Sequence, residues 1–139
     1  HSNILPWRES CAEVVPIAEN MCGGVDIEDL ERKLKMFRGR PLKIVHRTRT
    51  GAFAAASNLT GALEDVDHIT RVLHHGGAVA FWDYATAAPY VRIDMNPDGS
   101  SDAVFISGHK FLGGAGTPGL LVCKKRLFRN RTPVVPGGG

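Results

Sequence analysis

The sequence predicts an α/β fold with a largely parallel sheet, because short apolar segments alternate along the chain with amphipathic helical patterns. Residues 78–82 read Ala-Val-Ala-Phe-Trp without interruption, which is typical of a strand buried on both faces of a sheet. Residues 103–106 and 120–123 are apolar in the same way. We therefore expect three buried strands here, and two further short strands at 12–17 and 42–45.

Two amphipathic helices are predicted, over residues 26–38 and 65–75. The first has one apolar stripe, made of Ile27, Leu30, Leu34 and Phe37. The second has a similar stripe, made of Val66, Ile69, Val72 and Leu73. Acidic residues gather at the start of the first helix and basic residues at its end, which matches the helix dipole. Glycine follows each pattern and is expected to end both helices.

Composition indicates one globular domain over residues 1–139 and excludes several functional classes. The 43% hydrophobic and 22% charged content is ordinary for such a domain. The net charge of +3 comes without a basic tract, so no nucleic-acid partner is expected. No apolar run approaches the roughly 20 residues of a membrane span. Three scattered cysteines, Cys11, Cys22 and Cys123, favour a reduced compartment, so we expect a cytoplasmic protein, or a mitochondrial one for a longer parent.

Polar residues follow three of the predicted sheet segments directly. Asp83 comes after the first buried strand, and the run from Ser107 through His109 to Lys110 comes after the second. Asn58 lies in a polar turn after a run of small residues. Because ligands bind at the carboxyl ends of parallel strands, we expect these side chains to converge on one site.

The residue types at this edge suit one cofactor. Desolvation disfavours the charged form of a buried lysine, so Lys110 would become an amine nucleophile for an aldehyde. If the Asp83 carboxylate is buried, it needs a cationic partner, and a protonated pyridine nitrogen can serve as one. Serine, histidine and glycine-rich backbone suit a phosphate. Taken singly, Lys110 has a plainer interpretation as a solvated surface residue, and Asp83 as a strand-end turn residue or helix cap.

Four motifs together resemble the class V aminotransferase family, a fold type I group that includes cysteine desulfurases and selenocysteine lyases. The motifs are Asn58-Leu-Thr60-Gly61, Asp83-Tyr-Ala-Thr86-Ala-Ala-Pro89, Ser107-Gly-His-Lys110-Phe and Pro136-Gly-Gly-Gly139. The resemblance covers the whole chain. It implies the three-layer α/β/α large domain of a pyridoxal-phosphate enzyme, with a mixed, mostly parallel sheet. We expect this domain to be incomplete, with an N-terminal portion and a C-terminal small domain outside residues 1–139.

The resemblance also implies a role for each motif residue. Lys110 would carry pyridoxal phosphate as a Schiff base and move the proton on the substrate carbon. Asp83 would pair with the pyridinium nitrogen, Ser107 and His109 would hold the phosphate, and Asn58 would lie near the ring and the substrate carboxylate.

One motif position departs from the desulfurases, which usually have Gln where this chain has Thr86, near the phenolic oxygen of the cofactor. The expected function is therefore that of a pyridoxal-phosphate-dependent transferase or lyase acting on an amino acid, with a homodimeric parent enzyme. The alternative is a truncated, inactive fragment, or a remnant used only for interaction. No metal site is expected, because His74 and His75 are adjacent on a helix and face different directions.

Overall fold

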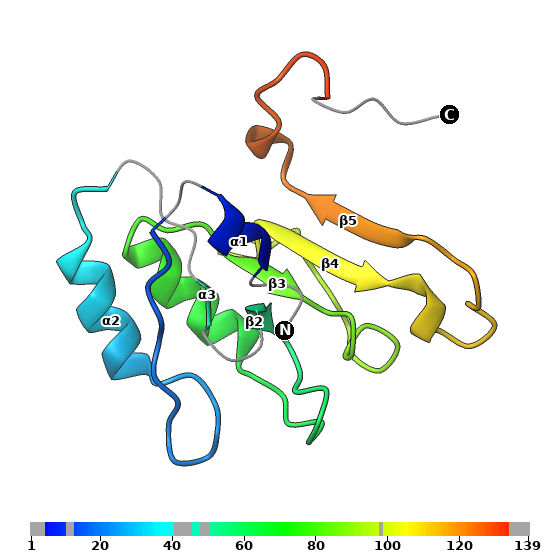
Figure 1. Cartoon of the computed structure of the whole chain (residues 1–139), viewed down its shortest axis with the longest axis horizontal. Coiled ribbons are helices and arrows are strands. Elements are labelled where there is room, and N and C mark those ends of the chain that lie inside the picture. The colour runs from blue at the N-terminus through cyan, green and yellow to red at the C-terminus, as the bar shows by residue number, and fades with distance from the viewer. Residues whose placement is uncertain (1–4, 11–12, 41–45, 48–50, 98, 134–139) are drawn as a thin grey trace.

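The computed structural model describes residues 5–10, 13–40, 46–47, 51–97 and 99–133. The helices are α1 (Leu5–Glu9), α2 (Ile27–Met36) and α3 (Val66–His75), with short 3-10 turns at Gly108–Lys110 and Lys125–Leu127. The strands are β1 (His46–Arg47), β2 (Gly51–Ala54), β3 (Phe81–Asp83), β4 (Ala103–Ser107) and β5 (Gly119–Cys123). Helices α1 and α2 come first, then strands β1 and β2, helix α3, and strands β3, β4 and β5, as Figure 1 shows.

The five strands form one mixed sheet in the order β1-β2-β3-β4-β5. The three inner strands β2, β3 and β4 run parallel, whereas β1 and β5 pair antiparallel with their neighbours. The α/β prediction with a mixed sheet is thus confirmed. Because β2, β3 and β4 are parallel, their carboxyl ends meet at the same edge of the sheet.

Trp82 marks the face of the sheet that α3 covers. The Trp82 side chain is fully buried, and its ring lies 5.1 Å from that of Phe53 on β2, centroid to centroid. Its Nε1 donates a hydrogen bond of 2.9 Å to Thr70 Oγ1 on α3. Helix α2 packs beside α3, so two helices lie on this side (Figure 1).

The opposite face carries the side chains that alternate with Trp82 along the strand. Phe81 on this face lies 6.3 Å from Trp7 of α1 and 6.4 Å from Phe105 of β4, ring centroid to ring centroid. Helical structure therefore lies on both faces of the sheet, as the predicted three-layer arrangement requires. Helix α1 itself was not predicted, because its five residues show no apolar period.

Both predicted helices are confirmed, each with an aspartate cap. Asp26 accepts a hydrogen bond of 3.0 Å from the Asp29 N–H, and Asp65 accepts one of 3.0 Å from the His68 N–H. These bonds satisfy backbone donors at the helix starts, and each helix begins one residue later than predicted. The predicted stripes face the core, with Leu30 on α2 and Leu73 on α3 fully buried.

Glycine at the end of α3 lets the two helices approach closely. A Cβ atom at Gly76 would lie 2.8 Å from Leu34 Cδ1 on α2, which is too close for a real contact. Gly76 is therefore required by packing between the helices, whereas Gly77 after it has a positive φ of 70° that favours glycine.

Two predicted strands are not found as such. Residues 13–17 have no regular structure, so the strand expected at 12–17 is wrong over its described part. The strand expected at 42–45 lies outside the described residues. The predicted strand 78–82 begins later, at Phe81, because the Asp102 carboxylate accepts the Ala80 N–H at 2.8 Å.

The expected burial of residues 120–123 is wrong. Strand β5 forms as predicted, but Leu120, Leu121 and Val122 are each about half exposed. The reason is its position at the edge of the sheet, where β4 is its one strand neighbour (Figure 1). An apolar run predicts a strand, but the position of that strand in the sheet determines how much of its side-chain surface is buried.

Candidate functional site

A cavity of about 570 Å³ opens at the carboxyl ends of the parallel strands. The six residues predicted for the site all line it: Asn58, Asp83, Thr86, Ser107, His109 and Lys110. They come from three separate segments, which follow or end β2, β3 and β4. The convergence predicted from the sequence is therefore observed in the fold.

Asp83 is the last residue of β3 and is half-buried at the base of the cavity. Its Oδ1 accepts a hydrogen bond of 2.7 Å from the Ala85 N–H, which orients the carboxyl group and starts the turn that follows. The Tyr84 N–H donates to the Phe105 carbonyl at 2.8 Å, so this turn is tied to β4. Thr86 lies in the same turn and is also half-buried.

Ser107 ends β4, and Lys110 is the last residue of the 3-10 turn that follows. The loop after this turn folds back closely on it. A Cβ atom at Gly114 would overlap the Gly108 carbonyl oxygen, and Thr117 Oγ1 donates a hydrogen bond of 2.6 Å to the Gly114 carbonyl. The position of Lys110 is thus set by a loop that tolerates no side chain at Gly114.

The turn after β2 brings Asn58 to the same cavity. Ser57 holds the turn, since its carbonyl accepts the Gly61 N–H at 2.9 Å and its Oγ accepts the Thr60 N–H at 3.2 Å. Gly61 has a positive φ of 73°, a conformation that favours glycine. Asn58 itself is exposed, at the open side of the cavity.

The six predicted residues differ in how deep they lie. Three are half-buried, namely Asp83, Thr86 and Ser107. Three are exposed, namely Asn58, His109 and Lys110. The expectation that Lys110 is buried, and activated by desolvation, is therefore wrong for the part of the chain that the structure describes. The described residues place the Lys110 amine at the cavity but do not remove it from water.

Sequence reasoning missed the apolar wall of the cavity, which includes Phe105, Leu120 and Leu121. One of these could have been found from strand alternation, because Phe105 lies two residues before Ser107 and so faces the same side of β4. Phe105 pairs with Leu121 across the β4–β5 hairpin. That register depends on the turn between the strands, and local sequence does not show it.

No group of three or more metal-ligating side chains occurs within the described ranges. His74, considered above for metal binding, instead places its Nε2 2.8 Å from Asp102 Oδ2, at the opposite end of the sheet from the cavity. No helix in the described part of the chain is long and apolar enough to cross a membrane.

Comparisons with known proteins agree with this fold. The family model described as aminotransferase class-V matches residues 1–139. A probable cysteine desulfurase of Halalkalibacterium halodurans is 31% identical over 99% of the chain, and one of Treponema pallidum is 28% identical over 100% of it. The apo structure of a cysteine desulfurase from Thermococcus onnurineus matches 99% of the chain with a TM-score of 0.73 and 25% identity. A NifS-like protein from Rickettsia africae matches 88% with a TM-score of 0.70 and 28% identity.

The fold matches part of these solved α/β structures. The chain belongs to the class V aminotransferase family, whose members generally depend on pyridoxal phosphate. It spans 32% of the length of the two curated relatives and 31 to 32% of the two solved chains. The resemblance inferred from the four motifs is therefore confirmed at the level of the family.

Proposed function

We propose that the cavity at the carboxyl ends of β2, β3 and β4 binds pyridoxal phosphate, and that Lys110 attaches to the aldehyde of the cofactor. One observation carries this proposal. A lysine, an aspartate and a serine from the ends of two parallel strands line a single cavity, together with Asn58, Thr86 and His109. These groups match what the cofactor requires of a protein: an amine, a carboxylate and hydrogen-bond donors for a phosphate.

The residues of the cavity suit the cofactor in their chemical type. The half-buried Asp83 carboxylate is proposed to pair with the protonated ring nitrogen, and it already accepts a hydrogen bond that orients it. The hydroxyl of Ser107 and the ring of His109 are proposed to bind the phosphate. Asn58 and Thr86 are proposed to contact the ring from the two turns that flank Asp83 and Ser107.

Pyridoxal phosphate, when bound, supplies an electron-withdrawing ring that stabilises negative charge on the substrate carbon. The protein's part is to position groups around that carbon. The amine of Lys110 is proposed to take the proton from the α-carbon of the substrate and to return a proton there. Asn58, at the open side of the cavity, is proposed to orient the carboxylate of the substrate.

The proposed substrate is an amino acid, and cysteine is the first one to test, because two relatives with similar sequences are named as probable cysteine desulfurases. Thr86, which replaces the Gln usual in desulfurases, makes transamination the second reaction to test. The homodimer expected for a longer parent protein stays a prediction.

Visible absorbance tests the proposal directly. Purified chain titrated with pyridoxal phosphate should gain absorbance in the visible range that Lys110→Ala lacks. Lys35→Ala, which removes an exposed lysine on α2, is the matched control and should keep the absorbance. A colourless wild-type chain, or equal absorbance in wild type and Lys110→Ala, would contradict cofactor attachment at Lys110. The first of these results would favour the alternative of an inactive or interaction-only fragment.

A further inference from the structure

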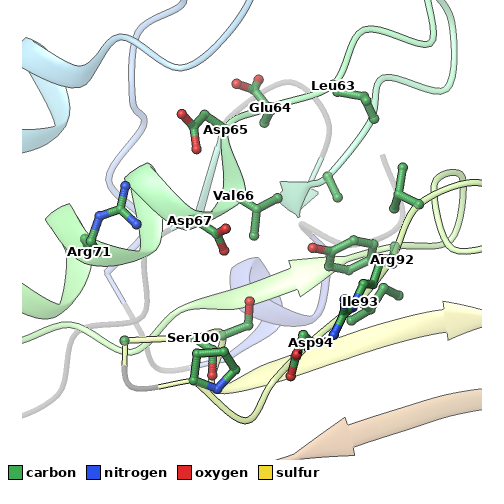
Figure 2. Close-up of a pocket in the computed structure, with 16 residues that line it drawn as sticks. Leu63, Glu64, Asp65, Val66, Asp67, Arg71, Arg92, Ile93, Asp94 and Ser100 are labelled. Carbon is green, nitrogen blue, oxygen red and sulfur yellow. Dashed lines mark hydrogen bonds and ion pairs between the residues drawn. The ribbon is translucent and has the colours of Figure 1, made fainter.

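A second cavity, of about 630 Å³, lies on the α3 side of the sheet and shares no lining residue with the first. It opens between the beginning of α3 and residues 91–97 and 99–101 of the connection from β3 to β4. Figure 2 shows side chains of α3, including Val66 and Asp67, facing Arg92 and Ile93 across this space. Nothing in the proposed cofactor chemistry uses it.

Tyr84 is the buried polar residue of this second cavity. It follows Asp83 directly, so the two adjacent side chains line different cavities. Tyr84 is 6% exposed, and its hydroxyl forms no hydrogen bond with the residues that the structure describes. Burial, together with the nearby charge of Asp67, raises the pKa of Tyr84, so the phenol stays neutral at pH 7. A buried hydroxyl without a partner is unfavourable unless a ligand or water satisfies it.

Asp67 supplies the negative charge that acts on that hydroxyl. In Figure 2 its carboxylate points into the cavity, and Arg71 lies further along the same helix. Within the described ranges Asp67 forms no salt bridge or hydrogen bond through its carboxylate. The pair of Asp67 with Tyr84 thus provides one charged and one neutral oxygen toward the same space.

The other carboxylates around the cavity already have partners. Asp65 caps α3, and Glu64 accepts the Val25 N–H at 3.3 Å. Asp94 accepts the Asn96 N–H at 3.0 Å and lies 3.2 Å from Arg92 Nη2. Of the two arginines that line the cavity, Arg92 is paired in this way, and Arg71 lies on α3 one helical turn after Asp67. The apolar wall of the cavity is formed by Val66, Val91 and Ile93, which pack against the core.

We propose that this cavity binds a primary alkylammonium group, with the ammonium between the Asp67 carboxylate and the Tyr84 oxygen and the alkyl chain along the apolar wall. An ammonium donates three hydrogen bonds and accepts none, so both oxygens are suitable partners. Asp67 is exposed at the cavity mouth, and its attraction for a cation is weakened by water, so the affinity is expected to be in the millimolar range. Such a group occurs in free alkyl amines and in lysine side chains.

An NMR titration of the 15N-labelled 139-residue chain with n-pentylammonium tests the site. Saturable shifts should centre on the amides of Asp67 and Tyr84. Asp67→Asn should weaken binding by about fivefold or more, and Tyr84→Phe by about threefold, as expected for one partly exposed ion pair and one hydrogen bond. Glu28→Gln is the matched control, because Glu28 occupies the same position in the first turn of α2 as Asp67 in α3. It should bind n-pentylammonium as the wild type does.

Two further titrations test whether the cavity prefers a cation and whether the ammonium group comes from a free amine or from a lysine side chain. Hexanoate, an anion of similar length, should not bind, and equal binding of hexanoate would overturn the proposal by showing a merely apolar cavity. A blocked pentapeptide with one central lysine distinguishes a lysine side chain, which requires peptide binding, from a free amine, which does not. Absence of saturable shifts with both n-pentylammonium and the peptide, or equal affinity in Asp67→Asn, would also overturn it. These results are independent of the cofactor test, since the cavities share no residue.

Discussion

Two aspartates at opposite ends of the sheet have opposite environments. Asp102 lies just before β4 and is fully buried, and it is bonded to the Ala80 N–H, to His74 and to Arg126. Asp83 ends β3, is half-buried, and lines a cavity beside the exposed Lys110. The amino end of the sheet thus uses its carboxylate to hold the chain together, whereas the carboxyl end presents its carboxylate to a cavity.

The electrostatics of Asp102 show how a buried carboxylate becomes structural. Burial raises the pKa of Asp102, but the hydrogen bonds from Ala80 and His74 and the positive charges of His74 and Arg126 outweigh burial, so the pKa lies below its ordinary value. The ionised form therefore stabilises the fold. Residues satisfied in this way are poor ligand-binding groups, and the comparison teaches that function is to be sought where polar groups line a cavity.

Removing Asp102 should have the largest effect on stability. Asp102→Ala leaves the Ala80 N–H, His74 and Arg126 without their acceptor, and should lower the free energy of unfolding by about 3 kcal/mol. Urea denaturation followed by tryptophan fluorescence measures this. Glu31→Ala, an exposed carboxylate on α2, is the control and should leave the midpoint unchanged. A midpoint in Asp102→Ala equal to that of wild type would refute the structural role.

Gly114→Ala should combine a loss of stability with a loss of cofactor attachment. The added Cβ overlaps the Gly108 carbonyl oxygen, so the turn that carries Lys110 must shift, which we expect to cost about 2 kcal/mol. The visible absorbance formed with pyridoxal phosphate should fall in the same variant. Ala115→Ser, at the exposed neighbouring position, should change neither quantity. Full absorbance in Gly114→Ala would show that this loop does not position Lys110.

Acid should remove the contribution of Asp102. Because its folded-state pKa is lowered, its stabilisation is complete above the unfolded-state pKa, near the ordinary value of 3.8, and is lost as the pH falls through the folded-state pKa. The stability difference between wild type and Asp102→Asn should therefore shrink between about pH 5 and about pH 2.5. A difference that stays constant over this range would contradict the ionised, stabilising state of Asp102.

Asp83→Ala should have the smallest effect on stability. It removes the hydrogen bond to the Ala85 N–H in a half-exposed turn, so the free energy of unfolding should fall by about 0.5–1 kcal/mol. Affinity for pyridoxal phosphate, followed by visible absorbance, should fall clearly in the same variant. If Asp83→Ala destabilised the chain as much as Asp102→Ala, the contrast between the two ends of the sheet would be wrong.

The parts of the fold that depend on local pattern could be predicted from the sequence. The stripes that contain Leu30 and Leu73 identify α2 and α3, and the apolar runs identify β3, β4 and β5. The candidate site could also be predicted, because in a parallel sheet the residues after the strands converge whatever the details of packing. The family resemblance added the roles proposed for those residues.

Features that depend on contacts distant in sequence could not be predicted. The exposure of Leu121 follows from the edge position of β5, and the late start of β3 follows from Asp102, 22 residues beyond Ala80. The burial expected for Lys110 was wrong because it requires covering segments, and none of the described residues covers it. The second cavity was missed because Tyr84 and Asp67 are brought to the same cavity only by the packing of α3 against the sheet.

Peptide mapping after borohydride reduction tests the central claim most directly. The chain is incubated with pyridoxal phosphate, reduced to make the attachment permanent, digested and analysed by mass spectrometry. The account predicts that the cofactor mass lies on the peptide containing Lys110 in large excess over the other lysines, and that Asp83→Ala reduces its yield. Cofactor mass spread evenly over exposed lysines such as Lys35 and Lys125, or concentrated on one of them, would contradict it.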